Sequence, residues 1–369
     1  MTGERTTTTT ATAASRPLDR RTVLKATGAA ALTFGAPTIW RKASAQDRRI
    51  VIRDPGGPYE QGFGEAFYKP FTEATGIEAV GVAGQHEPTS QIKAMVDTGS
   101  YTWDMALLSR SAHNQLISEG DGYLEELNID TPGLKEVPER FVTPFYAGNN
   151  VFTAILAYRT DAFEGREPPR GWQDLWDVER VPGRRALRKH PFDTMEEALL
   201  ADGVPPDQLY PLDIDRAFAS LDRIKNDVAI WWEGGAQTSQ LLKTGEVDMC
   251  PTWNARAQAA IDDGAPVKIV WNQNLYSSEG WCIIKGTPKG DLCREFIRFA
   301  VDAERQAAFT PYLGYGPTIP RAYDFVDPER AKILPTYEEN FKTGVAVDEA
   351  YWGENKDQVI ERFNAWLLG

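Results

Sequence analysis

Strand-like and helix-like stretches alternate through most of this chain, and the alternation limits the folds open to it. Strands are predicted where short apolar runs end in Gly, Pro or polar residues, at 49–53, 77–83, 103–108, 151–158, 228–232, 249–253 and 267–271. Helices are predicted where apolar residues recur every three or four positions, at 59–75, 91–98, from 111 onward, at 236–243, 255–263, 292–303 and 359–367. This order favours parallel sheets covered by helices. A length of 369 residues favours two such sheets, and with no linker in the sequence the two lobes are expected to interleave along it.

Residues 1–45 contain the parts of an export signal. Arg20-Arg21 precedes a modestly apolar run over 26–39, and Ala43-Ser44-Ala45 has the form of a cleavage site. The alternative is a membrane anchor, but the run is short and holds Gly35 and Pro37, whereas a spanning helix needs about 20 residues. We therefore expect a leader similar to those of the twin-arginine (Tat) pathway, removed after Ala45, and a periplasmic protein.

Composition and motifs exclude several classes of function. The net charge of −13 argues against a nucleic-acid partner, which would call for a basic face. The sequence has no nucleophile elbow, zinc-protease, phosphate-loop or C-x-x-C motif. Cys250, Cys282 and Cys293 lie in apolar or helical surroundings and are interpreted as small buried residues, with a Cys282–Cys293 bridge left open. We expect no enzymatic activity, no metal and no cofactor.

Aromatic residues stand at the ends of several predicted strands. Trp231-Trp232-Glu233, Trp253-Asn254 and Trp271-Asn272 each end one strand, and 276–281 leads into another. In open α/β sheets ligands lie just outside the carboxyl ends of the strands. The group therefore predicts the wall of a ligand cleft, although any single Trp in it fits a core position equally well.

Several dispersed motifs occur in an order that resembles one family. They are Gly171-Trp172-Gln173-Asp174-Leu175-Trp176, Leu241 with Gly245-Glu246-Val247-Asp248-Met249, Trp253-Asn254, Tyr315-Gly316-Pro317-Thr318-Ile319-Pro320-Arg321-Ala322 and Trp352-Gly353-Glu354-Asn355. Together they resemble the periplasmic substrate-binding proteins of ABC transporters, in particular the spermidine/putrescine-binding branch. The resemblance covers about residues 48–368.

The resemblance implies a two-lobed α/β periplasmic binding protein fold of type II. Lobe 1 would comprise 46–155 plus 281–325, and lobe 2 would comprise 156–280 plus 326–369. The ligand would lie in the cleft between the lobes, and crossover strands, one of them 151–158, would form the hinge. The implied partners are a small cationic or zwitterionic solute and an ABC permease at the inner membrane, and we expect a monomer.

In polyamine-binding relatives, aromatic rings sandwich the methylene chain and carboxylates hold the ammonium ends. The positions of this sequence expected to bind ligand are Tyr59, Ser109, Asp193, Trp231, Glu233, Trp253, Glu279 and Trp352. Of these, Glu233 is a candidate acid because it follows the Trp pair, and Glu279 because Gly280 stands where the family has an acid. His190 replaces a second expected acid.

Because two acids expected from the family are missing or displaced, ligands other than a polyamine remain alternatives. An ω-amino acid such as 4-aminobutyrate needs one acid and one donor, and Arg110 or Arg256 could face its carboxylate. The primary expectation is a polyamine such as putrescine or spermidine, and the ω-amino acid is the alternative. An oligosaccharide ligand is a further option among binding proteins. An exported sugar-acting hydrolase is the alternative from another class, since aromatic platforms and acid pairs also serve sugars.

Overall fold

The computed structural model describes residues 48–84, 87–119 and 122–369, which belong to one compact unit. The predicted export signal, residues 1–45, lies outside the described residues. No helix in the described ranges is long and apolar enough to cross a membrane.

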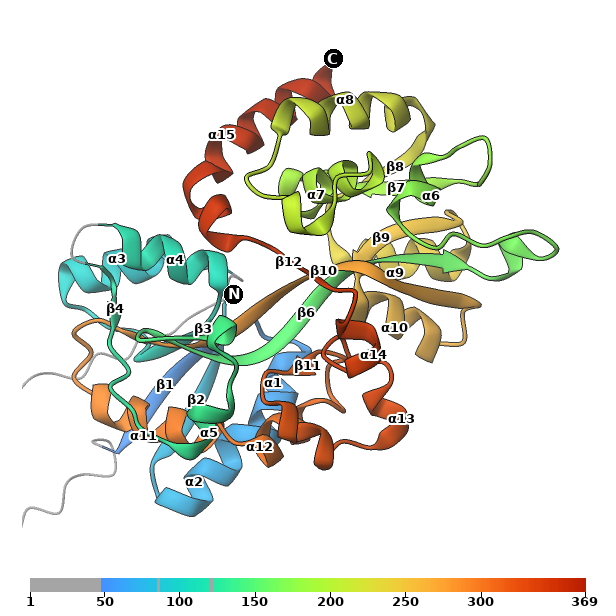
Figure 1. Ribbon diagram of the computed structural model, residues 1–369. Coiled ribbons are helices and arrows are strands. Elements are labelled where there is room, and N and C mark those ends of the chain that lie inside the picture. Colours follow the sequence, from blue (N-terminus) through green and yellow to red (C-terminus); the bar gives the residue numbers. More distant parts are fainter. Residues whose placement is uncertain (1–47, 85–86, 120–121) are drawn as a thin grey trace, which may run out of the picture. The chain divides into compact units, whose positions relative to one another are not determined.

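One mixed sheet runs through the described residues in the order β2-β1-β3-β10-β6-β9-β7-β8 (Figure 1). The strands are β1 (Arg49–Asp54), β2 (Glu78–Ala83), β3 (Met105–Ser109), β4 (Leu124–Glu125), β5 (Val142–Thr143), β6 (Tyr146–Arg159), β7 (Arg185–Arg188), β8 (Val228–Trp232), β9 (Met249–Trp253), β10 (Val267–Ile284), β11 (Gly316–Pro317) and β12 (Val345–Ala346). At one end β1 pairs in parallel with β2 and β3, and at the other β7 pairs in parallel with β8 and β9. The predicted strands 228–232 and 249–253 are confirmed with their bounds as β8 and β9.

The two parallel halves are joined by antiparallel strands, which differs from the expectation of two separate parallel sheets. β6 pairs antiparallel with β10 and with β9, and β10 also pairs antiparallel with β3. Figure 1 shows β6 and β10 side by side between the two halves. The prediction ended β10 at Trp271, whereas the strand continues to Ile284. The strand contains a bulge after Val270: Gln273 has φ 55, and the register with β6 shifts between Val270 and Leu275. The sequence pattern is interrupted at this bulge, although the strand continues.

Helices cover both halves of the sheet. They are α1 (Pro58–Phe63), α2 (Lys69–Thr75), α3 (Thr89–Thr98), α4 (Arg110–Ser118), α5 (Pro132–Glu136), α6 (Trp172–Trp176), α7 (Pro191–Ala201), α8 (Ile214–Ile224), α9 (Gly235–Thr244), α10 (Asn254–Asp262), α11 (Gly290–Ala300), α12 (Ala303–Phe309), α13 (Pro328–Ala331), α14 (Glu338–Phe341) and α15 (Glu349–Leu368). The helix predicted over 59–75 is α1 and α2 joined by a π-helical turn over 64–68, and it ends at Gly76 with φ 68, as its stop signal predicted.

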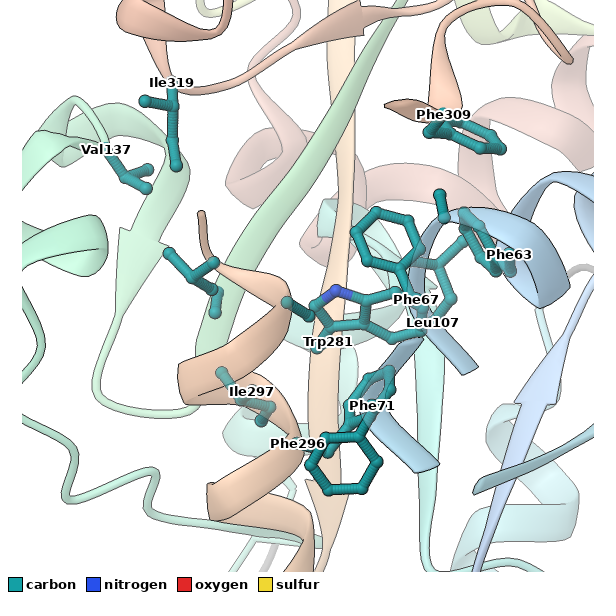
Figure 2. Close-up of a cluster of buried hydrophobic side chains, with 14 of the residues drawn as sticks. Phe63, Phe67, Phe71, Leu107, Val137, Trp281, Phe296, Ile297, Phe309 and Ile319 are labelled. Atoms are coloured by element: carbon teal, nitrogen blue, oxygen red, sulfur yellow. The ribbon is translucent and has the colours of Figure 1, made fainter. Parts of the chain in front are cut away.

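Each half of the sheet has its own hydrophobic core. In the β1–β3 half, Phe63, Phe67 and Phe71 pack with Trp281 and Phe296 (Figure 2). The ring centroids of Phe63 and Trp281 lie 5.0 Å apart, and those of Phe71 and Phe296 lie 5.2 Å apart. The spacing of four residues places the three Phe side chains on one helix face, and from that face they make these contacts.

The core of the β7–β9 half is separate. It is formed by residues of β9, α6, α7, α8 and α15, among them Trp172, Leu199, Phe218 and Phe363. Two further hydrophobic clusters pack against the sheet, one that includes Trp232, Leu242 and Cys250 and one that includes Ile92, Leu108 and Leu116. The predicted bounds of the two lobes stay a prediction. All three cysteines are buried and free, so the interpretation of them as small buried residues is confirmed.

Candidate functional site

A cavity of about 620 Å³ is lined by residues from both halves of the sheet. From the first half come Tyr59 after β1, Ser109 at the end of β3 and Glu279 on β10. From the second half come Arg188 at the end of β7 and Trp253 at the end of β9. The cavity therefore lies where carboxyl ends of parallel strands from both halves meet, the position at which open α/β sheets bind ligands.

An acidic and aromatic wall forms the side of the cavity toward the first half. The Tyr59 hydroxyl donates to Oε2 of Glu279 at 2.5 Å, and both side chains are buried. Burial and then the nearby Glu279 carboxylate raise the pKa of Tyr59 well above its usual value. The ring centroids of Tyr59 and Tyr315 lie 6.2 Å apart, and those of Phe152 and Tyr315 lie 5.7 Å apart. A carboxylate beside aromatic rings suits a cation, because the charge and the ring quadrupoles both attract it.

Only glycine fits at position 280, where the resembling family has an acid. A Cβ atom on Gly280 would lie 2.5 Å from the Ala147 carbonyl oxygen and 2.5 Å from the ring of Tyr146. Strands β10 and β6 approach too closely at this point for any side chain. Glu279, one residue earlier, lines the cavity and supplies a carboxylate on this strand instead.

Ser109 lines the cavity but is engaged by its neighbours. Its Oγ caps α4 by accepting from the Ala112 N–H at 3.1 Å, and it donates to Oε1 of Glu87 at 3.1 Å. The other carboxylate oxygen of Glu87 accepts from Nζ of Lys356 on α15 at 2.8 Å. This ion pair joins the loop after β2 to α15 at the edge of the cavity, since both of its residues line it.

A guanidinium group forms the opposite wall. Nη1 of Arg188 donates to Oδ2 of Asp193 at 2.9 Å and to the carbonyl of Phe192 at 3.2 Å. The guanidinium carbon lies 4.9 Å from the ring centroid of Trp253 and 5.7 Å from that of Trp232. Nε of Arg188 is buried and has no hydrogen-bond partner within the described part of the chain. Arg188 is thus held in place by Asp193 and the indoles, and its side chain, 17% exposed, lines the cavity. A positioned guanidinium group of this kind suits a carboxylate.

Asp193 is held in an unusual backbone conformation. It has φ 71, which is rare for a non-glycine residue, and it interrupts the first turn of α7. Burial raises the pKa of its carboxyl, while the Arg188 charge and hydrogen bonds from Arg188 and Trp253 act in the opposite direction. The strained turn places the carboxylate against Arg188 rather than in solvent.

Behind Arg188, α7 carries two further buried acids, Glu196 and Glu197. Oε1 of Glu196 accepts from the Tyr210 hydroxyl and from Nε1 of Trp352, both at 2.6 Å, and burial raises its pKa to about 7. Burial, with Asp193 and Glu196 nearby, raises the pKa of Glu197 well above its usual value. Carboxyls with raised pKa values hold protons near neutral pH, which limits the negative charge behind Arg188.

Five of the eight predicted site residues line the cavity, and three do not. The five that line it are Tyr59, Ser109, Asp193, Trp253 and Glu279. Trp231 packs instead against Phe363 and Trp366, with ring centroids 6.3 and 5.8 Å away. Neighbouring strand residues point to opposite faces, so it is Trp232 that packs beside Trp253, with ring centroids 5.7 Å apart.

Glu233 and Trp352 lie outside the cavity for different reasons. The Glu233 side chain is 70% exposed and pairs with Lys189 at 2.7 Å, beyond the end of the edge strand β8. Trp352 is fully buried and donates to Glu196, and its ring centroid lies 5.0 Å from that of Phe192. Phe192, and not Trp352, lines the cavity.

Three weaker candidates have distinct places. Arg256 lines the cavity as an exposed residue of α10, whereas Arg110 does not line it and lies 5.1 Å from the Tyr146 ring. His190 lines the cavity and caps α7 by accepting from the Phe192 N–H at 3.2 Å. Burial and the nearby charges of Arg188 and Lys356 lower the pKa of His190 to about 3, so it is neutral at pH 7.

The sequence analysis missed Arg188 because it did not predict β7. This strand has four residues, Arg185 to Arg188, and both of its ends are charged. A usable signal was present, because His190-Pro191 marks a helix start three residues after a short apolar pair, Ala186-Leu187. In the described ranges no group of His, Cys, Asp or Glu could hold a metal ion.

Comparisons with known proteins bear on this site. The sequence profile of the bacterial extracellular solute-binding proteins matches residues 66–336. A gamma-aminobutyric acid-binding protein of Pseudomonas aeruginosa is 34% identical over 334 residues, 88% of this chain and 92% of that protein.

Solved structures agree with the sequence comparison. An ABC transporter substrate-binding protein from Bradyrhizobium japonicum is 34% identical, with a TM-score of 0.80 over 86% of this chain and 99% of that one. A GABA receptor is 32% identical, with a TM-score of 0.77 over 86% of this chain and 97% of that one. The chain therefore has the two-lobed type II fold of periplasmic binding proteins, as the sequence predicted.

Proposed function

This chain belongs to the bacterial extracellular solute-binding proteins that serve ABC transporters, and from that premise we propose that its cavity binds a small ω-amino acid such as 4-aminobutyrate. The family binds solutes rather than transforming them, so the expectation of no enzymatic activity is confirmed and the hydrolase alternative is dropped. A small solute and a membrane permease are the partners that the family requires.

The observation that carries the proposal is the pairing of opposite charges across one cavity. Arg188 presents a partly exposed guanidinium group from one wall, and Glu279 presents a carboxylate beside Tyr59 on the other. An ω-amino acid carries a carboxylate at one end and an ammonium at the other, so it can satisfy both walls. A buried charge needs such a partner, because burial without one costs several kcal/mol.

A polyamine fits these walls less well. One ammonium of putrescine would suit Glu279, but the other would lie near the Arg188 guanidinium, where like charges repel. The relatives named for gamma-aminobutyric acid favour the same ligand class. Both observations support the ω-amino acid, the alternative of the sequence analysis, over the polyamine.

A ligand panel tests the proposal. We expect 4-aminobutyrate to bind at least about 10-fold more tightly than putrescine, butyrate or butylamine, since each of these lacks one of the two charges or carries the wrong one. Titration calorimetry would measure the affinities, and the rise in melting temperature and the change in Trp fluorescence would check them. Tighter binding of putrescine than of 4-aminobutyrate would restore the polyamine reading.

We also propose export through the Tat pathway and hinge closure of two lobes around the ligand. The lobes would be those of the sequence analysis, 46–155 with 281–325 and 156–280 with 326–369, in a monomer. Replacing both Arg20 and Arg21 by Lys should retain the precursor in the cytoplasm, as measured by cell fractionation and immunoblotting. Normal periplasmic recovery of that variant would contradict the Tat route.

A further inference from the structure

Ser277 is a cavity-lining serine on the same strand as Glu279. It lies on β10 two residues before Glu279, and both residues line the cavity. Side chains two positions apart on a strand share one face of the sheet, about 7 Å from each other. Phe152, the partner of Ser277 on β6, lines the cavity as well. Ser277 therefore stands on the same wall as the carboxylate proposed to hold the ligand's ammonium group.

The proton of the Ser277 hydroxyl is bound by a carboxylate outside the cavity. Oγ of Ser277 donates to Oε1 of Glu349 at 2.5 Å, and Glu349 does not itself line the cavity. A serine hydroxyl has one O–H donor and two acceptor lone pairs. With its donor used by Glu349, Ser277 can offer a ligand only an acceptor, which suits an N–H group and not a carboxylate oxygen.

Backbone contacts on both sides of Glu349 fix its position. The strand β12, shortly before it, pairs in parallel with β10, and the N–H of Val347 donates to the carbonyl of Tyr276 at 3.0 Å. Asp348 caps α15 by accepting from two backbone N–H groups at 3.0 and 2.9 Å. Glu349 is the first residue of α15. It is thus held beside Ser277 by the backbone and the helix cap as well as by the hydroxyl.

This arrangement fits the amine end of the proposed ligand. An alkylammonium group has three N–H donors, which a single acceptor does not satisfy. The Glu279 carboxylate also accepts from the Tyr59 hydroxyl, so part of its acceptor capacity is already used. A neutral acceptor farther along the same strand would take a second N–H of the ligand without adding charge to the cavity. The Ser277 oxygen is an acceptor of this kind.

We propose that Ser277 is a specificity-determining residue that accepts a hydrogen bond from the ligand's ammonium group, and that Glu349 is the positioning residue that orients its hydroxyl. The inference rests on the proposed function, because it takes the ligand to be a primary amine with a carboxylate at its other end. Ser277 acts on the amine alone, so it does not contribute to the binding of butyrate. The ratio of the affinities for 4-aminobutyrate and butyrate therefore measures its role.

The variant Ser277→Ala removes the hydroxyl and little else. The measurement is made at pH 8, above the pKa of about 7 to which burial raises the Glu349 carboxyl. We expect the affinity for 4-aminobutyrate to fall about 10-fold and that for butyrate to change less than about 2-fold. Titration calorimetry would measure both affinities, and the melting temperature would check that the variant is folded. An unchanged ratio of the two affinities would overturn the inference.

Ser278 offers a matched control. It is the next residue on β10, 3% exposed against 4% for Ser277, and its hydroxyl is also hydrogen-bonded, to that of Tyr146 at 3.0 Å. It points to the opposite face of the strand and does not line the cavity. Ser278→Ala should keep the wild-type ratio within about 2-fold. An equal fall in both variants would indicate a disturbed strand and not a lost ligand contact, which would also overturn the inference.

Two variants of Glu349 test the positioning. Glutamine keeps an oxygen that can accept from Ser277, whereas methionine has a similar length and only a weak acceptor. Both remove the charge, so the difference between them isolates the hydrogen bond. We expect the ratio to be at least about 3-fold higher in Glu349→Gln than in Glu349→Met. Equal ratios, with only the melting temperature lower in Glu349→Met, would show a purely structural Glu349. Failure of the wild-type protein to bind any ω-amino acid would instead overturn the proposed function.

Discussion

Arg188→Met is expected to weaken binding of 4-aminobutyrate by about 100-fold or more. Removing one partner of a buried, hydrogen-bonded charge pair costs about 2–5 kcal/mol, and the ligand carboxylate would lose the guanidinium group that lines the cavity. Titration calorimetry at pH 7 would measure the loss. Putrescine should lose little or gain affinity, because the repulsive charge is gone.

A second variant separates the binding effect from an effect on folding. Arg188→Met leaves the buried Asp193 carboxylate without its ion pair, so the melting temperature should also fall. Adding Asp193→Asn removes that charge and should recover stability without recovering affinity. If the double variant binds 4-aminobutyrate like the wild-type protein, Arg188 does not hold the ligand.

Arg188→Lys tests the geometry of the contact. Lysine keeps the positive charge, but it lacks the planar fork that donates two parallel hydrogen bonds. We expect an affinity between those of the wild-type protein and Arg188→Met. Wild-type affinity for 4-aminobutyrate in Arg188→Lys would mean that Arg188 contributes only its charge.

Glu196→Gln is expected to remove about 3 kcal/mol of pH-dependent destabilisation. The carboxyl has a pKa of about 7 in the folded protein, against a usual value of 4.5, mainly because it is buried. Between these two values the folded state holds a proton that the unfolded state has released. The free energy of unfolding therefore falls as the pH rises from about 4.5 to about 7, by about 1.4 kcal/mol for each unit of pKa difference.

The hydrogen bonds of Glu196 make glutamine a well-matched replacement. Both donors, the Tyr210 hydroxyl and Nε1 of Trp352, bond to the same oxygen, Oε1, and an amide oxygen can accept both. Urea unfolding at pH 5 and pH 8 would measure the effect. The variant should exceed the stability of the wild-type protein by much more at pH 8 than at pH 5.

Other buried acids also contribute to the pH dependence of the free energy of unfolding. Glu349, with a pKa raised to about 7 by burial, adds a fall of the same sign that remains in the variant. Glu354→Gln, at an exposed position on α15, should follow the wild-type pH dependence and serves as the control. An unchanged slope in Glu196→Gln would mean that the Glu196 carboxyl is already ionised in the folded protein at neutral pH.

Local patterns were sufficient for part of the secondary structure, although the helices α7 and α8 were not predicted. The strands β8 and β9 and the stop of the helix at Gly76 follow from apolar runs and from a left-handed glycine, signals contained within a few residues. Tyr59, Ser109 and Trp253 were selected from the family resemblance, Trp253 also from its position at a strand end, and all three line the cavity. The four-residue strand β7 carried too short a signal, and Arg188 was missed with it.

The sequence by itself determined the α/β class, the family and the strand-end positions around which a site could form, because these depend on local periodicity and on motif order. Only the tertiary structure decided how neighbouring residues are placed around the cavity. Strand parity puts Trp232 rather than Trp231 beside Trp253, and the close approach of β10 to β6 requires Gly280 and leaves the acid to Glu279. The opposition of Arg188 and Glu279 was likewise beyond the sequence, because it joins strands from the two halves of the sheet and no local pattern encodes that distance.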